Sequence, residues 1–324
     1  MRRPSGLTTC LAAVLLCSPA IIVRSLSAAE NPSAMSLKEL VRESVYNEVN
    51  SDQSSGRRFM FRDQKSSLHL SQTKLLVETN DAMAGMTIAK DGHPLSAQER
   101  QQELDRLENY VKNPDELTKK RKQEKEDADR TERILAALPD AFLYEPDGTV
   151  PGTASIGREG DRLVRLKFRP NPDYNPPTRT EQVLTGMWGH LLIDATEKRV
   201  AEIDAVLQKD VGFGWGILGH LDRGGHFLVQ QADVGGHHWE VTRMDLAFVG
   251  KILLFKKLNI RSVEVFSDFQ PVPSNLTFAQ GVELLKKESA GSEPQSAKRE
   301  PGKHRSDRAT RASEQAGEQL CCDR

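Results

Sequence analysis

Aromatic residues, net charge and long apolar runs are all scarce in this sequence of 324 residues. Only 6% of the residues are aromatic, and 45 Lys and Arg are balanced by 46 Asp and Glu, so the basic excess of a dedicated nucleic-acid-binding protein is missing. The mean hydropathy is −0.54, which excludes a bundle of membrane helices. The composition therefore predicts a soluble, globular chain without a nucleic-acid partner.

Cysteine is scarce as well, and the positions of the four residues exclude a disulfide framework. Cys10 and Cys17 lie in the first apolar run, Cys321 and Cys322 are adjacent, and residues 30–320 contain none. No His or third Cys stands at ligand spacing beside the terminal pair. We interpret that pair as incidental and exposed, able to cross-link two chains.

Residues 1–29 have the order of a secretory signal peptide. Arg2 and Arg3 precede an apolar run, and small residues close the segment up to Ala29. The run holds about 17 residues, fewer than the roughly 20 that span a bilayer, which favours cleavage after Ala29 over a membrane anchor. We therefore expect an exported, periplasmic protein.

The remainder divides by composition into a body and a tail. From Lys286 onward the sequence is dominated by charged and small residues, with no apolar cluster before Leu320. Such a stretch cannot bury enough apolar surface to offset its chain entropy. We expect a single domain over residues 30–285, with a helical insertion at 96–138, and a disordered tail over residues 286–324.

Helical patterns open the body and fill the insertion. Residues 36–50 carry apolar side chains at helical spacing behind a capping box of Ser36 and Glu39. Ser96 and Glu99 form a second capping box. Another helix is predicted to begin at Pro114 and to run to Leu138, where Pro139 ends it.

The middle of this last helix has almost no apolar side chains. Between Lys119 and Arg133, seven of the fifteen residues are basic and five are acidic. A basic docking arm is one interpretation, but mixed signs at helical spacing are more typical of a solvated surface helix.

Strand patterns dominate the rest of the body. Alternating or strand-like segments with few helical patterns between them predict antiparallel neighbours. They occupy residues 57–63, 66–79, 86–90, 162–169, 187–194, 199–207, 226–234, 238–247 and 259–269. The predicted fold class is α+β: a curved antiparallel sheet, an incomplete barrel, with an N-terminal helix and a helical insertion.

Several short motifs resemble one family. They are a turn and helix start at Asp91, Gly92, Pro94, Leu95, Ser96 and Glu99, an RP-x-P-x-Y motif at Arg169, Pro170, Pro172 and Tyr174, and a strand at Gly189, Leu191, Leu192, Ile193 and Asp194. In this order the chain resembles bacterial exported proteins of the outer-membrane lipoprotein-sorting and lipoprotein-carrier group. The resemblance implies an incomplete antiparallel barrel whose concave, apolar face is covered by helices and receives acyl chains.

Catalytic and cofactor motifs are absent or incomplete. Residues 214–219 match G-x-G-x-x-G, but only four residues separate them from Gly224, too few for the helix that a dinucleotide site needs. We interpret them as a flexible apolar loop. Asp194, Glu202 and Asp204 are interpreted as the solvated side of a strand. We therefore predict no enzyme and no cofactor.

Half of the eight histidines lie between positions 220 and 238. If the turn at residues 234–236 centres a hairpin, His238 faces about Gln231, and His226 lies about 17 Å away along the strand. Neighbouring His237 and His238 point to opposite faces. This register predicts no metal site.

A curved sheet with one apolar face must cover that face with helices or with a ligand. We therefore expect an exported, non-enzymatic protein that holds an acyl chain, lipid or lipoprotein in the concave face and contacts membranes only transiently. The candidate lining residues, each also compatible with an ordinary dry core, are Val164, Leu166, Phe168, Trp188, Leu192, Ile203, Leu207, Phe227, Val229, Trp239, Val241, Val263 and Val265.

The alternative is a cell-envelope interaction module, without a small-molecule ligand, in which the charged helix and the tail bind a partner protein. Deleting residues 96–138 is expected to separate the two, because a carrier keeps its ligand and an adaptor loses its partner.

Overall fold

The computed structural model of the protein describes residues 36–213, 219–252 and 256–291. The predicted signal peptide, all four cysteines and the tail beyond residue 291 lie outside the described residues. Within the described ranges, no helix is both long and apolar enough to cross a membrane.

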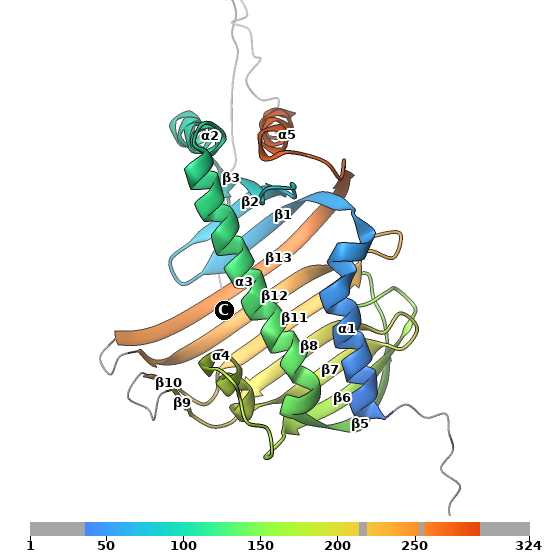
Figure 1. Ribbon diagram of the computed structural model, residues 1–324. Helices are drawn as coiled ribbons and strands as arrows, with labels where there is room; N and C mark the ends of the chain where they lie inside the picture. The colour runs from blue at the N-terminus through green and yellow to red at the C-terminus, as the bar shows by residue number, and fades with distance from the viewer. Residues whose placement is uncertain (1–35, 214–218, 253–255, 292–324) are drawn as a thin grey trace, which may run out of the picture. The chain divides into compact units, whose positions relative to one another are not determined.

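The body is built on one antiparallel sheet of thirteen strands that does not close (Figure 1). Eleven strands follow the order β4-β3-β2-β1-β13-β12-β11-β8-β7-β6-β5, and β9 and β10 pair with each other beside β12. The strands are β1 (Arg58–Ser67), β2 (Ser71–Val77), β3 (Ala84–Lys90), β4 (His93–Pro94), β5 (Phe142–Pro151), β6 (Arg162–Pro170), β7 (Met187–Asp194), β8 (Arg199–Leu207), β9 (Val211–Phe213), β10 (Gly219–Leu221), β11 (His226–Asp233), β12 (Trp239–Ile252) and β13 (Lys256–Val272). The predicted fold class is confirmed.

Strand register defines two faces of this sheet. One cross-strand row joins Leu166, Leu191, Ile203, Val229 and Met244, and the sheet face that carries it is here called the helix face. The neighbouring row, on the outer face, joins Lys167, His190, Asp204, Leu228 and Asp245. From β6 to β12, apolar residues thus collect mainly on the helix face and charged residues mainly on the outer face, as the alternation in β6 predicts.

Two helices, α1 (Leu37–Ser55) and α3 (Pro114–Ala141), lie over the helix face (Figure 1). Val41 and Val45 of α1 and Leu138 of α3 are buried in a cluster with apolar residues of β5 to β9. The buried members are Val41, Val45, Leu138, Ala141, Phe142, Leu166, Phe168, Leu184, Met187, Leu191, Ile193, Val200, Ala205, Leu207 and Val211.

A second buried cluster lies at the β1–β3 end of the sheet. It combines Met60, Val77 and Met86 with Leu107 of α2 (Ala97–Lys112) and Phe278 of α5 (Phe278–Gly291). The short helix α4 (Arg179–Gln182) and a 3-10 turn at Val183–Gly186 precede β7. The two ends of the sheet are therefore filled by different helices.

The predicted capping box at the start of α2 is present. The hydroxyl of Ser96 accepts a hydrogen bond from the Glu99 N–H, and the Ser96 N–H donates to the Glu99 carboxylate. The backbone N–H and then the hydroxyl of Ser96 lower the pKa of Glu99 to about 2. The part of the helix stability that depends on this charge is therefore present above pH 4.5 and is lost as the pH falls towards 2.

We expect Ser96→Ala to lower the free energy of unfolding by about 1 kcal/mol, because α2 loses its cap. Urea denaturation of the full chain measures the change. Gln98→Ala, at an exposed position of the same turn, is the control and should change stability by less than about 0.5 kcal/mol. An equal effect of the two substitutions would contradict a specific role of the cap.

Several elements differ from the sequence predictions, among them the end of α3, strand β5 and the end of α5. Pro139 does not end α3, which continues to Ala141, because a proline removes only the hydrogen bond of its own N–H and its ring acts on the preceding turn. Strand β5 was not predicted, because Pro146 and Gly148 are typical of a turn; the register shift of the β5–β6 pair between Pro146 and Thr149 accommodates them. Residues 286–291 were predicted to be disordered but form the end of α5, where Ser289 is buried.

Candidate functional site

The helix face has a filled part and a less filled part. Under α1 and the end of α3 its side chains form the first buried cluster. On β11, β12 and β13, by contrast, Val229, Met244, Leu246 and Phe266 are half-buried and belong to none of the clusters formed by the described residues. We call these four residues the apolar strip. Apolar side chains that no core covers are what an apolar ligand requires.

The position of α3 explains why the strip is left uncovered. In the first half of α3, Glu124 accepts a hydrogen bond from the Met83 N–H before β3, and the end of the helix packs on β5. The eight strand spacings from β2 to β5 measure about 38 Å, and a helix of 28 residues is about 42 Å long. The helix thus reaches from one end of the sheet to the other over the intervening strands.

The middle of α3 offers the strip no apolar partner. Eleven of the thirteen residues from Arg121 to Arg133 are exposed, and the segment's one apolar residue, Ala128, is among them. Its charges pair along the helix, for example Lys125 with Asp129 at 2.8 Å and Lys120 with Glu124 at 2.6 Å. Such i, i+4 pairs stabilise a helix that has no buried face. The predicted solvated helix is confirmed for this segment.

A polar pocket of about 410 Å³ lies where α2 and the first half of α3 meet β2 and β3. Its lining includes Lys74 and Thr87, which belong to the helix face at this end of the sheet. The full lining is Gln72, Lys74, Leu76, Met83, Gly85, Thr87, Glu103, Arg106, Leu107, Tyr110, Lys120, Glu124 and Phe278. Polar groups thus border the apolar strip on its β1–β3 side.

Two carboxyl groups lie between the strip and this pocket. Asp63 of β1 stands directly opposite Phe266 of the strip and opposite Lys74. Glu264 pairs in register with Met244 and accepts a hydrogen bond from Lys65. Burial, and then the charge of Glu264, raise the pKa of Asp63 above its usual range, while Lys74 and Lys65 oppose the shift.

The structure brings together only part of the predicted lining. The helix-face members that pack in or against the first buried cluster are Val164, Leu166, Phe168, Ile203, Leu207 and Phe227. Val229 lies in the apolar strip, and Val241 stands opposite Gln231, whose side chain donates to Glu48 of α1. These eight residues share the helix face.

The other five predicted residues do not share that face. Trp188, Val263 and Val265 lie on the outer face, and Leu192 and Trp239 form a small separate cluster with Leu163 and Ala201. The expectation of one common face is therefore wrong for them. In β7 the helix face is carried by Met187, Leu191 and Ile193, because successive side chains of a strand point to opposite faces and Leu192 lies between the last two.

Sequence reasoning missed most of the apolar strip. Met244 and Leu246 alternate with Arg243 and Asp245, a period-two pattern that predicts a strand with one apolar face. That pattern was sufficient to find these two residues. Phe266 gave no comparable signal, because apolar residues occupy both faces of β13 next to it.

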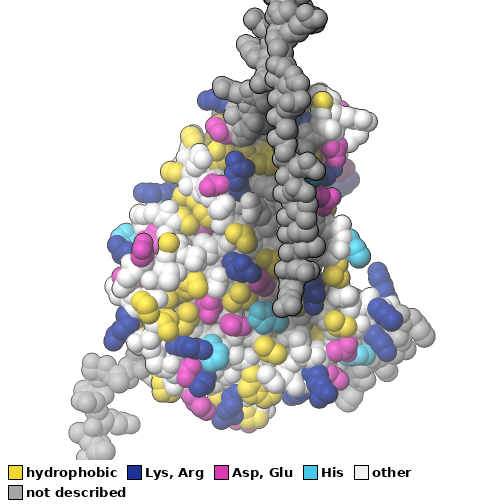
Figure 2. Space-filling view, turned by 180° about the vertical axis from the view of Figure 1, so that it is seen from behind, with side chains coloured by type: hydrophobic (Ala, Val, Ile, Leu, Met, Phe, Trp, Pro, Cys, Tyr) yellow, Lys and Arg dark blue, Asp and Glu magenta, His cyan; other side chains and the backbone are white. Residues whose placement is uncertain are grey.

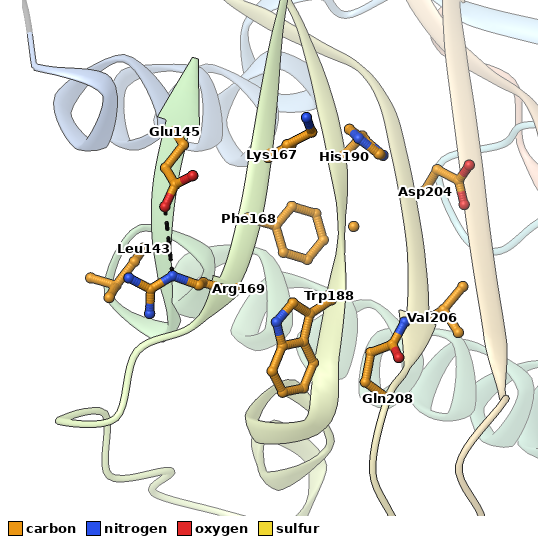
Figure 3. Close-up of a pocket in the computed structure, with 11 residues that line it drawn as sticks. Leu143, Glu145, Lys167, Phe168, Arg169, Trp188, His190, Asp204, Val206 and Gln208 are labelled. Carbon is orange, nitrogen blue, oxygen red and sulfur yellow. Dashed lines mark ion pairs between the residues drawn. The ribbon is translucent and has the colours of Figure 1, made fainter. Parts of the chain in front are cut away.

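The outer face has a hollow of about 420 Å³ over β5 to β8 (Figure 3). Its lining is Leu143, Glu145, Lys167, Phe168, Arg169, Trp188, Gly189, His190, Asp204, Val206 and Gln208. The charges at its rim have partners: Lys167 and His190 both contact Asp147, and Asp204 contacts His226 at 2.9 Å. Figure 2 shows apolar, basic and acidic side chains interspersed over this side of the molecule. The hollow is thus bordered by satisfied ion pairs.

The four clustered histidines lie in different surroundings. His226 contacts Asp204, His220 contacts Asp222, and His238 packs against the ring of Phe59. The predicted opposition of His238 and Gln231 is wrong, because Gln231 pairs with Val241. The turn is wider than expected and places His237 in a left-handed conformation, with φ 63°.

Among the described residues, one group has metal-ligand geometry: Glu197, Asp233 and His237. Arg158 contacts the Glu197 carboxylate at 3.2 Å and that of Asp233 at 3.8 Å. Burial acts to raise the pKa of Glu197, but hydrogen bonds from His237 and Trp239, with the charge of Arg158, lower it overall. These carboxylates therefore have cationic partners within the protein.

Within the described residues, the other sequence motifs do not come together as a catalytic or cofactor-binding site. Residues 214–218 of the G-x-G-x-x-G match lie outside them, and Gly219 begins β10. Asp194 is buried and accepts from the N–H groups of Thr196 and Glu197, so it fixes the β7–β8 turn and does not lie on a solvated face. Glu202 and Asp204 share the outer face as predicted.

No protein-family model and no curated protein matches this chain.

Proposed function

We propose that this chain is an exported, non-enzymatic protein that binds an acyl chain of a lipid or lipoprotein on the apolar strip. The observation that carries the proposal is the contrast between the strip and the helix above it. Val229, Met244, Leu246 and Phe266 are half-buried, while the α3 segment that crosses this face is charged and exposed. An acyl chain would remove the strip from water without displacing a packed core.

Native mass spectrometry of the protein purified from its own cell envelope, followed by lipid extraction, tests the proposal. We expect a stoichiometric, acyl-bearing ligand. An apo mass together with no uptake of added lipids or lipopeptides would overturn it. The exposed, self-paired segment of α3 would then favour the alternative, a cell-envelope module that binds a partner protein.

Deleting residues 96–138 cannot separate these two functions. The deletion removes Leu107 and Leu138, each a member of a buried cluster. Loss of either function would then follow from unfolding. Point substitutions on the two faces of one strand are more informative.

We expect Leu246→Asp to weaken acyl-chain binding at least about tenfold, because it places a charge on the surface that would contact the ligand. Ala247→Asp is the matched control. Ala247 is the next residue of β12, on the outer face, opposite His226 and Arg261. Titration with a fluorescent fatty acid measures both variants. Equal affinities of the two variants would show that the strip is not the binding surface.

A further inference from the structure

Asp63 is a buried acid without a partner. It is 8% exposed, its Oδ1 atom is buried, and this atom makes no hydrogen bond within the described structure. Its helix-face neighbours are Lys65 on the same strand, Glu264 and Phe266 on β13, and Lys74 on β2. A buried polar atom that lacks a hydrogen bond is unfavourable for stability and is rare in folded proteins.

Lys74 is the complementary group. It stands directly opposite Asp63, and within the described part of the chain its ammonium group makes no ion pair at 4.0 Å or less. The other cations of the polar pocket are engaged, Lys120 with Glu124 and Arg106 with Glu103. An acid without a hydrogen bond and a base without an ion pair thus lie side by side.

This pair lies at the end of the apolar strip, since Phe266 is the cross-strand neighbour of Asp63. A ligand whose acyl chain covers the strip would therefore bring its polar head towards Asp63 and Lys74. The head that satisfies both groups carries a hydrogen-bond-donating cation and an anion. An ammonium group donates to a carboxylate, and a phosphate accepts from a lysine.

We propose that Asp63 and Lys74 bind the zwitterionic head of an ethanolamine phospholipid, with the primary ammonium group on Asp63 and the phosphate on Lys74. The proposal rests on the proposed function, because the acyl chains would occupy the apolar strip. A choline head has the same charges but no N–H to donate, and a glycerol head has no positive charge. Recognition should therefore discriminate between heads that carry identical chains.

The test compares binding of dioleoyl phospholipids with ethanolamine, choline and glycerol heads to the full mature chain by native mass spectrometry. We expect the ethanolamine lipid to bind at least about tenfold more tightly than the other two. Equal binding of all three would overturn this inference and leave the proposed function intact. Binding of none of them would overturn this inference, and together with no uptake of added lipopeptides it would overturn the proposed function as well. Equally tight binding of water-soluble phosphoethanolamine would also contradict it, since the acyl chains would then be dispensable.

Two substitutions separate the contributions that the ammonium group and the phosphate group of the lipid head make to binding. Asp63→Asn should reduce binding of the ethanolamine lipid to the level of the choline lipid. Lys74→Met should weaken all three lipids alike, because each carries the phosphate. Asp204→Asn, on the outer face, is the control and should preserve the preference. An unchanged preference in Asp63→Asn would overturn the inference.

The stability of Asp63→Asn provides a second readout and shows that the variant folds. The pKa of Asp63 is raised by burial and by Glu264, against Lys74 and Lys65, so its ionisation disfavours the folded state as the pH rises above 3.8. The variant should therefore melt at a higher temperature than the parent at pH 7, and the difference should shrink towards pH 4. A lower melting temperature at pH 7 would show that Asp63 has a partner that stabilises its charge.

Discussion

Glu48→Ala should lower the free energy of unfolding by about 3–5 kcal/mol, because it leaves the guanidinium group of Arg199 buried without its partner. The two side chains are 6% and 11% exposed, and two hydrogen bonds of 2.8 and 2.9 Å join them. The same carboxylate accepts from the Val200 N–H at 2.8 Å. This pair therefore fixes α1 to β8.

A neighbouring ion pair is the control for this prediction. Glu43 of α1 contacts Lys198 at 2.7 Å, but its side chain is 39% exposed. Glu43→Ala should change stability by no more than about 1 kcal/mol. Urea denaturation measures both variants, and the double variant Glu48→Met with Arg199→Met should recover most of the loss. Similar losses in Glu43→Ala and Glu48→Ala would contradict the buried-charge explanation.

Gly189→Ala should destabilise the protein by about 3 kcal/mol, the upper part of the range for overpacking. A Cβ atom at this position would lie 2.0 Å from the backbone oxygen of Asp204 and 2.8 Å from the Cα atom of Ala205. Both obstructing atoms belong to the backbone of β8, so no side-chain rotation relieves the contact. The β7–β8 pair would have to separate in the centre of the sheet.

Gly85→Ala is the matched control, in a strand at the other end of the sheet. Neither glycine has a positive φ. A Cβ atom at Gly85 would lie 2.7 Å from the Cδ2 atom of Leu76, the mobile end of a side chain, and 4.0 Å from the nearest backbone atom. We expect a change below about 1 kcal/mol. Thermal and urea denaturation compare the variants, and an equal loss in both would refute the backbone contact as the cause.

Local sequence patterns were sufficient to predict most of the secondary structure. Alternation in Arg162–Pro170 predicted β6, and Ser96 with Glu99 predicted the start of α2. The balanced charges of residues 119–133 predicted a helix that pairs with itself and needs no core. These features depend on residues within about four positions of one another, so the sequence displays them directly.

The register between strands that are far apart in the sequence determined which residues form the candidate site. Val263 looks like a lining residue, yet it faces outward because it pairs with Asp245, and Glu264 beside it faces the helices. Register shifts between Leu192 and Ile193 and between Gln230 and Gln231 change which residues share a face. A shift by one residue exchanges the two faces of a strand, and the local pattern does not fix that shift.

The sequence by itself determined the antiparallel sheet, the opening helix and the charged helix of this protein, because each depends on a repeating local pattern. Only the tertiary structure decided that α3 spans the sheet and leaves Met244 and Leu246 without a packed core. It also placed Asp63 opposite Lys74 and beside Phe266, although Phe266 is about 200 positions further along the chain. Such neighbours arise from strand pairing across the sheet, and the local hydrophobic period of the sequence does not reveal them.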